Sequence, residues 1–234
     1  MKRNFLHRFL SALTIVLLFL TPDIAGADAT AFFTIVERKD SPHWEIMGEF
    51  EKSRISMKAA NCYISWINAA QNGGITEIET AEGFSVRAIY RVNQIIGLGI
   101  GYERFWAETS GSSDAGHFKM ETYTDGILAI VSVHYPLTAK RISVNGEMAL
   151  GYYIGNYKES ENSWNQEGDD SAAGIRLEGK VSYAVTPYIS IVAGGGYRVL
   201  KMDGFGVNFL LPGHREVEMD YSGWFAGGGI NVSW

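Results

Sequence analysis

The feature that most constrains this chain is an alternation of apolar and polar residues with a period of two. Residues 173–184 show it most clearly, because Ile175 and Leu177 alternate there with Arg176, Glu178 and Lys180. Successive side chains of a β-strand point to opposite faces of the sheet. The pattern therefore predicts strands with one apolar face and one charged face.

Eight segments share this alternation. They are residues 44–51, 84–92, 95–105, 123–135, 142–153, 173–184, 189–199 and 223–234. No Pro/Ser-rich linker divides them, and after residue 28 no apolar run approaches the length of a spanning helix. The sequence predicts one all-β domain.

The stretch IIGLGIGYERF at 95–105 contains three glycines that a phosphate-binding turn could also use. Gly97, Gly99 and Gly101 fall on one face of the strand, however, and the period of two continues through them. A dinucleotide fingerprint needs the spacing G-x-G-x-x-G at a turn from strand to helix. We interpret these glycines as residues that make room for long side chains on neighbouring strands.

Aromatic residues indicate a membrane barrel rather than a soluble one. With alternate strands antiparallel, two groups of aromatic residues fall at two levels, as the interfacial belts of a membrane barrel do. One level holds Trp44, Tyr90, Tyr135, Tyr183 and Trp234, and the other holds Tyr102, Trp106, Tyr152, Tyr197 and Trp224. A soluble calycin-type barrel, the alternative, would bury the charges of residues 176–180 or expose both belts.

Connection lengths agree with a membrane barrel. Tight turns are expected near 93–94, 137–141 and 186–187, and long polar loops at 108–117, 159–170 and 203–218. Short turns at one end and long loops at the other are typical of outer-membrane barrels. The predicted fold is a transmembrane antiparallel up-and-down β-barrel of eight strands.

The N-terminus predicts export. Lys2, Arg3 and Arg8 precede an apolar run at 9–20, and an Ala-Gly-Ala sequence follows at 25–27. Because the run is shorter than the roughly 20 residues of a spanning helix, we predict a cleaved Sec signal peptide at 1–27. A periplasmic segment at 28–43 and the barrel at 44–234 would follow.

Charge and cysteine content exclude several classes. Cleavage removes three basic residues and Asp23, which leaves 17 basic and 25 acidic side chains and a net charge of −8. Such an acidic exported chain is not expected to bind nucleic acid. Cys62 is the single cysteine and cannot form an internal disulfide. We expect neither a cofactor nor a metal.

At this point the chain resembles the small outer-membrane barrels of the OmpA transmembrane-domain, OmpX and opacity-protein kind. The resemblance rests on the signal peptide, the eight alternating strands and the last strand GWFAGGGINVSW. It implies an outer-membrane location in a Gram-negative bacterium, contact with lipids and lipopolysaccharide, and an assembly signal at Ile230, Val232 and Trp234 for the barrel-assembly machinery. OmpA itself continues into a peptidoglycan-binding domain, so cell-wall anchoring is not implied here.

The inward charges are the main candidate site. They are Glu49, Arg87, Glu103, Glu147, Arg176, Glu178, Lys180 and Arg198. An eight-stranded barrel leaves room only for side chains, and buried unpaired charges are costly. We expect a salt-bridge plug, with a narrow ion channel as the alternative.

Two outer segments could carry contacts. Residues 55–70 place Ile55, Ala59, Tyr63 and Ile67 at helical spacing, which predicts a short amphipathic helix in the first long loop. The helix could pack as a lid on the barrel or cover a ligand. Phe205, Phe209, Leu210 and Leu211 in the last loop are a candidate contact with that helix or with an unknown extracellular ligand.

The predicted function is surface interaction or envelope integrity through the outer loops, without enzymatic activity. A lipid A- or phospholipid-modifying barrel is the enzymatic alternative. It would need a Ser/His/acid arrangement, and the sequence offers only Ser132 and His134 in one strand, without an evident third group.

Overall fold

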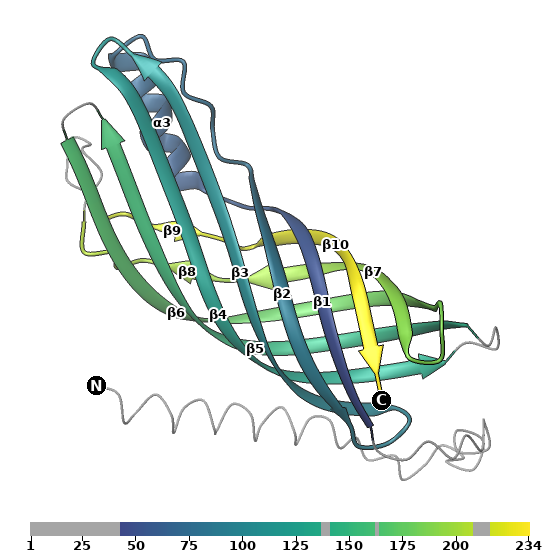
Figure 1. Ribbon diagram of the computed structural model, residues 1–234. Coiled ribbons are helices and arrows are strands. Elements are labelled where there is room, and N and C mark those ends of the chain that lie inside the picture. Colours follow the sequence, from purple (N-terminus) through teal and green to yellow (C-terminus); the bar gives the residue numbers. More distant parts are fainter. Residues whose placement is uncertain (1–42, 137–140, 162–163, 208–215) are drawn as a thin grey trace, which may run out of the picture. The chain divides into compact units, whose positions relative to one another are not determined.

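A computed structural model describes residues 43–136, 141–161, 164–207 and 216–234 (Figure 1). Its long strands are β1 (His43–Arg54), β2 (Thr80–Arg91), β3 (Ile96–Ser113), β4 (Gly116–Pro136), β5 (Ile142–Glu161), β6 (Trp164–Ala184), β7 (Ile189–Val199) and β10 (Gly223–Ser233). Neighbouring strands are antiparallel, and β1 pairs with β10 to close the sheet into a barrel. The prediction of eight antiparallel strands is confirmed.

The predicted signal peptide at 1–27 and the segment at 28–42 lie outside the described residues. Within the described ranges, no helix combines the length and the apolar composition needed to cross a membrane.

The alternation sorts side chains between the two faces of the barrel. Apolar side chains face outward, and those of Phe50 and Ile127 are 73% and 70% exposed. The aromatic residues of the two predicted belts also face outward. At the end with the short turns, which we call the lower belt, the rings of Trp44 and Tyr90 lie 5.1 Å apart. At the opposite end, the upper belt, the rings of Tyr197 and Trp224 lie 5.1 Å apart.

Side-chain oxygens set two of the short turns at the lower end. Oδ1 of Asn93 accepts hydrogen bonds from the backbone N–H groups of Ile95, at 2.8 Å, and Ile96, at 2.7 Å. Oγ1 of Thr186 accepts one from the N–H of Ile189 at 3.0 Å. Asn and Thr commonly form such turns because their short side chains reach the backbone two or three residues ahead.

The two long hairpins differ from the prediction. Most of residues 108–117 and of 159–170 are strand rather than loop. β3 and β4 stay paired as far as Ser113 and Gly116, and β5 and β6 as far as Glu161 and Trp164. Gly, Ser and Asp in these segments are typical of turns. Cross-strand pairing overrides that preference, and the two hairpins extend well past the ends of β1, β7 and β10 (Figure 1).

An apolar core fills the barrel above the charged lumen. The helix α3 (Lys58–Ala70) buries Ala60, Tyr63, Ile64 and Ile67, a spacing that places one helical face on the barrel. Figure 1 shows α3 beside the upper ends of β3 and β4, and the ring of Tyr63 meets Phe118 of β4 edge-on at 6.3 Å. The predicted short helix is confirmed, and it packs as a lid.

The last loop contributes to the same core. It begins with a two-residue ribbon of β8 (Lys201–Met202) and β9 (Met219–Asp220). Met202, Phe205 and Met219 are buried, and the ring of Phe205 lies 6.1 Å from that of Tyr157. The upper interior is therefore closed by packed side chains from three separate parts of the chain.

Candidate functional site

The centre of the lumen holds a cluster of charges around Arg87. Its guanidinium lies 3.1 Å from Glu49, 2.6 Å from Glu147 and 2.7 Å from Glu178. Lys180 approaches the same carboxylates, with its Nζ 3.1 Å from Glu49 and 2.9 Å from Glu147. These residues come from β1, β2, β5 and β6, so the cluster links strands on opposite sides of the barrel.

A second group of charges lies toward the upper end. Arg176 is 2.6 Å from both Glu51 and Glu103 and 3.2 Å from Glu178, which connects it to the central cluster. Arg198 also pairs with Glu51, and it lies 3.3 Å from Glu103. The two groups form one continuous array, because Glu178 contacts cations of both.

Aromatic rings cover the upper arginines. The guanidinium carbon of Arg176 lies 3.8 Å from the ring centroid of Phe225, and that of Arg198 lies 4.2 Å from Phe105. Tyr153 donates a 2.6 Å hydrogen bond to Glu103. Cation–π contacts and hydrogen bonds of this kind partly replace the water that these groups lose inside the barrel.

The structure brings all eight predicted inward charges together, and Glu51 joins them. We call these nine residues the lumen network. Each side chain is at most 5% exposed. Removing one partner from such an array leaves a buried charge without compensation, which typically costs about 3–5 kcal/mol.

A separate pair near the lower end was missing from the predicted site. Arg91 donates to Glu45 through Nε at 2.9 Å and Nη2 at 3.0 Å. Its Nη1 donates to Ser132 at 2.8 Å. Arg91, Glu45 and Glu51 all occupy the charged faces of their predicted strands, so the alternation contained the signal that would have identified them.

The interior glycines of β3 have two distinct roles. A Cβ atom on Gly101 would lie 3.0 Å from Cδ1 of Ile130 and 3.2 Å from Cγ of Arg87. One on Gly97 would lie 2.7 Å from Cγ2 of Ile89 and 3.3 Å from Cδ of Arg91. These two glycines leave space for isoleucines as well as for the arginines that the prediction named. A Cβ on Gly99 would instead lie 2.5 Å from the backbone oxygen of Ala88. Gly99 therefore permits a close approach between two strands.

Three layers close the described interior from bottom to top. The Arg91–Glu45 pair forms the lowest layer, the lumen network the middle one, and the apolar core beneath α3 the uppermost. A barrel of eight strands has an interior just wide enough for its side chains. The arrangement links the strands through side chains that are buried.

Ser132 and His134 are not arranged as a catalytic pair. Ser132 accepts its hydrogen bond from Arg91. His134 Nδ1 instead lies 2.6 Å from Oδ1 of Asn145. A Ser/His/acid mechanism requires the serine hydroxyl to bond the imidazole, so this geometry does not support the lipid-hydrolase alternative. Within the described ranges, no group of three His, Cys, Asp or Glu side chains is placed to hold a metal ion.

The remaining predicted residues have different surroundings. Ile230, Val232 and Trp234, proposed as the assembly signal, face outward with exposed fractions of 56%, 39% and 60%. Phe205 is buried in the upper core rather than exposed for a ligand. Phe209, Leu210 and Leu211 lie outside the described residues.

Two solved structures share the fold. The attachment invasion locus protein Ail of Yersinia pestis, solved with the heparin analogue sucrose octasulfate, has a TM-score of 0.50 and 14% identity, over 82% of this chain and 100% of that one. The outer membrane protein OprG of Pseudomonas aeruginosa has a TM-score of 0.53 and 12% identity, over 83% and 96%. No protein-family model matches the chain, and no curated protein matches it.

Proposed function

Because the chain has the fold of the small eight-stranded outer-membrane β-barrels, we propose that it resides in the outer membrane of a Gram-negative bacterium. There it acts through its outer hairpins in surface interaction or envelope integrity. The apolar outer face between the two aromatic belts supports the location, because such a band matches the hydrocarbon region of a bilayer.

The observation that carries the proposal is the contrast between the filled interior and the extended exterior. Buried charged and apolar side chains pack inside the described part of the barrel, which favours a structural role for the lumen network. The β3–β4 and β5–β6 hairpins continue as paired strand beyond the upper belt and present two surfaces outside the membrane. Paired strands position contacting groups more precisely than loops do.

Carboxylates outnumber cations among the charged residues on the outward faces of these hairpins. Glu108 and Asp169 are exposed there. The two lysines are paired, Lys119 with Glu121 at 2.6 Å and Lys158 with Glu167 at 3.2 Å. Ail was solved with a polysulfated sugar, but acidic hairpins disfavour a polyanion in this chain. Carboxylates at this level suit divalent cations that are shared with the phosphates of lipopolysaccharide.

The lower end supports the proposed biogenesis. The backbone of Trp234 exchanges hydrogen bonds with that of Trp44, at 3.1 and 3.3 Å, while its side chain remains exposed. An exposed terminal aromatic with Ile230 and Val232 on the same face fits recognition by the barrel-assembly machinery.

The test compares cells that overproduce three forms of the protein. One is the natural chain, one carries Glu108→Gln, Glu167→Gln and Asp169→Asn, and the control carries Ser110→Gln, Asn156→Gln and Asn165→Gln on the same hairpin faces. Heat-dependent gel mobility first verifies that each form is a closed barrel in the outer-membrane fraction. Entry of a hydrophobic dye then reports membrane integrity with and without a chelator.

We expect the natural chain and the control to reduce dye entry in a way that chelation abolishes. The acid-neutralised form should protect less, because it cannot share divalent cations with lipopolysaccharide. Equal protection by all three forms would overturn the proposed role of the hairpin carboxylates. Absence of the protein from the outer membrane would overturn the location.

A further inference from the structure

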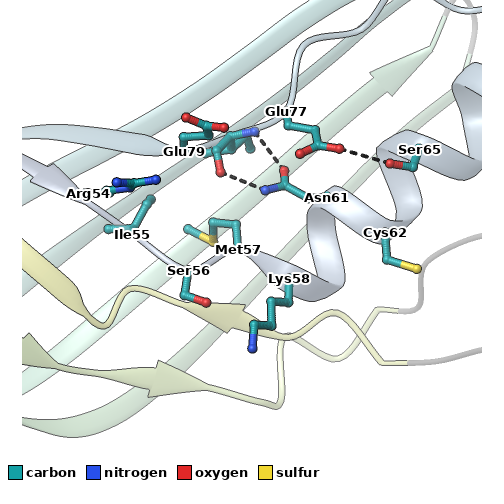
Figure 2. A pocket seen from close by; sticks show the side chains of 11 residues that line it. Arg54, Ile55, Ser56, Met57, Lys58, Asn61, Cys62, Ser65, Glu77 and Glu79 are labelled. Carbon is teal, nitrogen blue, oxygen red and sulfur yellow. Dashed lines mark hydrogen bonds between the residues drawn. The ribbon is translucent and has the colours of Figure 1, made fainter.

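A pocket of about 410 Å³ lies between the end of β1 and the start of α3 (Figure 2). Its lining comes from three short segments: residues 54–58, one face of the first turns of α3, and residues 77–79, which precede β2. Neither the lumen network nor the proposed hairpin surface includes these residues. The pocket is open to the outside of the barrel.

Hydrogen bonds fix the walls of this pocket. The side chain of Asn61 donates to the backbone oxygen of Ile78 at 2.9 Å, and the N–H of Ile78 donates back to Oδ1 of Asn61 at 2.7 Å (Figure 2). The N–H of Ile55 donates to the backbone oxygen of Glu79 at 3.0 Å. The three segments are thus held in place without a ligand, so binding would not require them to become ordered.

Two cations line the pocket without a partner. Arg54 and Lys58 form no ion pair or side-chain hydrogen bond with any of the residues that the structure describes. Lys52, two residues before Arg54 in β1, differs because its Nζ lies 3.7 Å from a carboxylate oxygen of Glu82. The start of α3 adds to the positive potential, since Met57 provides no side-chain cap and the first turn contains no acidic residue.

Two carboxylates line the same pocket. Figure 2 shows Glu77 and Glu79 along one edge, with Arg54 on the side of Glu79, and Lys58 at the opposite edge. Glu77 accepts one hydrogen bond from Ser65 at 3.1 Å, and both carboxylates are otherwise exposed. A simple anion would satisfy Arg54 and Lys58 but would be repelled by the glutamates. A ligand that carries both a negative and a positive charge could pair with the two cations and with the two glutamates of the pocket.

The pocket lies at the level where lipid headgroups are expected. Ser53 of β1 pairs with Phe225 of β10, so Arg54 is level with Trp224 of the upper belt. The side chain of Trp224 is 69% exposed. Tryptophan at such a level marks the boundary between hydrocarbon and water, and Arg and Lys commonly bind phosphate there.

We propose that this pocket binds a zwitterionic phosphoester, whose phosphate is bound by the cations Arg54 and Lys58 of the lining and whose ammonium group lies against Glu77 and Glu79. An ethanolamine phosphate carries these two charges a few bonds apart. The inference is independent of the hairpin proposal, because it concerns different residues and a different ligand.

Cys62 provides a direct reporter. It is the only cysteine of the chain, it is exposed, and it lines the pocket. A trifluoromethyl tag on Cys62 gives a fluorine NMR signal from the mature protein in a non-ionic detergent, which cannot compete for the site. The probes are glycerophosphoethanolamine, glycerol phosphate and ethanolamine.

We expect glycerophosphoethanolamine to shift the signal saturably and to bind roughly tenfold more tightly than glycerol phosphate or ethanolamine. Arg54→Ala with Lys58→Ala should abolish the tighter binding of glycerophosphoethanolamine. Glu77→Gln with Glu79→Gln should lower its affinity to that of glycerol phosphate. Lys52→Ala and Glu82→Gln are matched controls just outside the pocket and should change nothing. All variants are at the surface, and heat-dependent mobility verifies their folding.

Lipid nanodiscs distinguish the two sources of the ligand. If phosphatidylethanolamine in the disc shifts the tag and added glycerophosphoethanolamine causes no further change, the ligand is a membrane lipid. If the soluble compound still shifts the tag in such discs, the site takes a soluble ligand. Equal binding of glycerol phosphate and the zwitterion, or an unchanged response in the glutamate variant, would overturn the proposal.

Discussion

Tyr63 of α3 donates a 2.7 Å hydrogen bond to Oε1 of Glu159 on β5, a residue 96 positions further along the chain. The hydroxyl of Tyr157 donates to the other carboxylate oxygen. Glu159 is only 2% exposed, and no cation within the described part of the chain forms an ion pair with it. The lid helix is therefore fastened to the barrel by a buried carboxylate without a counter-ion.

We predict that the packing of α3 on the barrel is more stable at acid pH, because Glu159 is buried. Glu159 lies beyond the upper belt, and burial, with the charge of Glu161 nearby, raises its pKa above the ordinary value of 4.5. Its contribution to stability is fully present below pH 4.5 and is lost as the pH rises through the higher pKa of the folded state. Hydrogen exchange of the amides of residues 58–70, corrected for intrinsic rates, should show weaker protection at neutral than at acid pH.

The control for that experiment is Glu159→Gln, which keeps the shape but does not titrate. Its protection should vary little with pH. An equally steep dependence in Glu159→Gln would mean that another group controls the lid.

Arg87→Met should strongly destabilise the barrel. The substitution leaves Glu49, Glu147 and Glu178 with less compensation in a buried site, so the free energy of unfolding should fall by about 3–5 kcal/mol. Lys52→Met, which breaks an exposed pair, should change it by less than about 1 kcal/mol. Urea unfolding of protein in lipid vesicles, followed by tryptophan fluorescence, measures both.

Adding Glu147→Gln to Arg87→Met should recover part of the lost stability, because it removes one of the uncompensated charges. Strictly additive losses in this cycle would contradict a coupled lumen network.

Gly99→Leu should block assembly of the barrel. A side chain at this position collides with the backbone oxygen of Ala88, which cannot move without separating β2 from β3. Gly146→Leu is the matched control, because Gly146 faces outward with no atom within 4 Å of its added Cβ. The fraction of heat-modifiable protein after refolding should be close to zero for the first variant and natural for the second.

The purified barrel should give no discrete conductance in planar bilayers. Loosening the lid with Tyr63→Ala and Ile67→Ala should not create one, because the lumen network below the lid stays in place. Regular steps from the natural chain would support the channel alternative instead.

The faces of the strands could be predicted from the sequence because the period of two depends only on backbone geometry. Residues such as Arg176 and Glu178 therefore fall inside the barrel as expected. Their partners could not be predicted in the same way. Arg198 meets Glu51 across a distance of 147 residues in sequence, and this contact depends on how the strands are staggered around the ring.

The outer part of the molecule was harder to predict for a different reason. Beyond the upper belt water replaces lipid, so the outward face of residues 108–117 no longer needs apolar side chains and the segment resembles a loop. The pocket between the end of β1 and the start of α3 was also missed. It arises from hydrogen bonds between Asn61 and Ile78, residues whose spacing in the sequence has no recognisable pattern.

The pairing of β1 with β10 has a consequence for how the molecule folds and fails. Glu45 is opposite Ser233, so the strand pair that closes the barrel joins the first and the last strand of the described chain. Contacts between such distant segments form late and slowly. Until that strand pair forms, two unpaired edges remain exposed to other chains. Partly closed rings should therefore be rare at equilibrium, and loss of this one strand pair should release all eight strands in a single cooperative event.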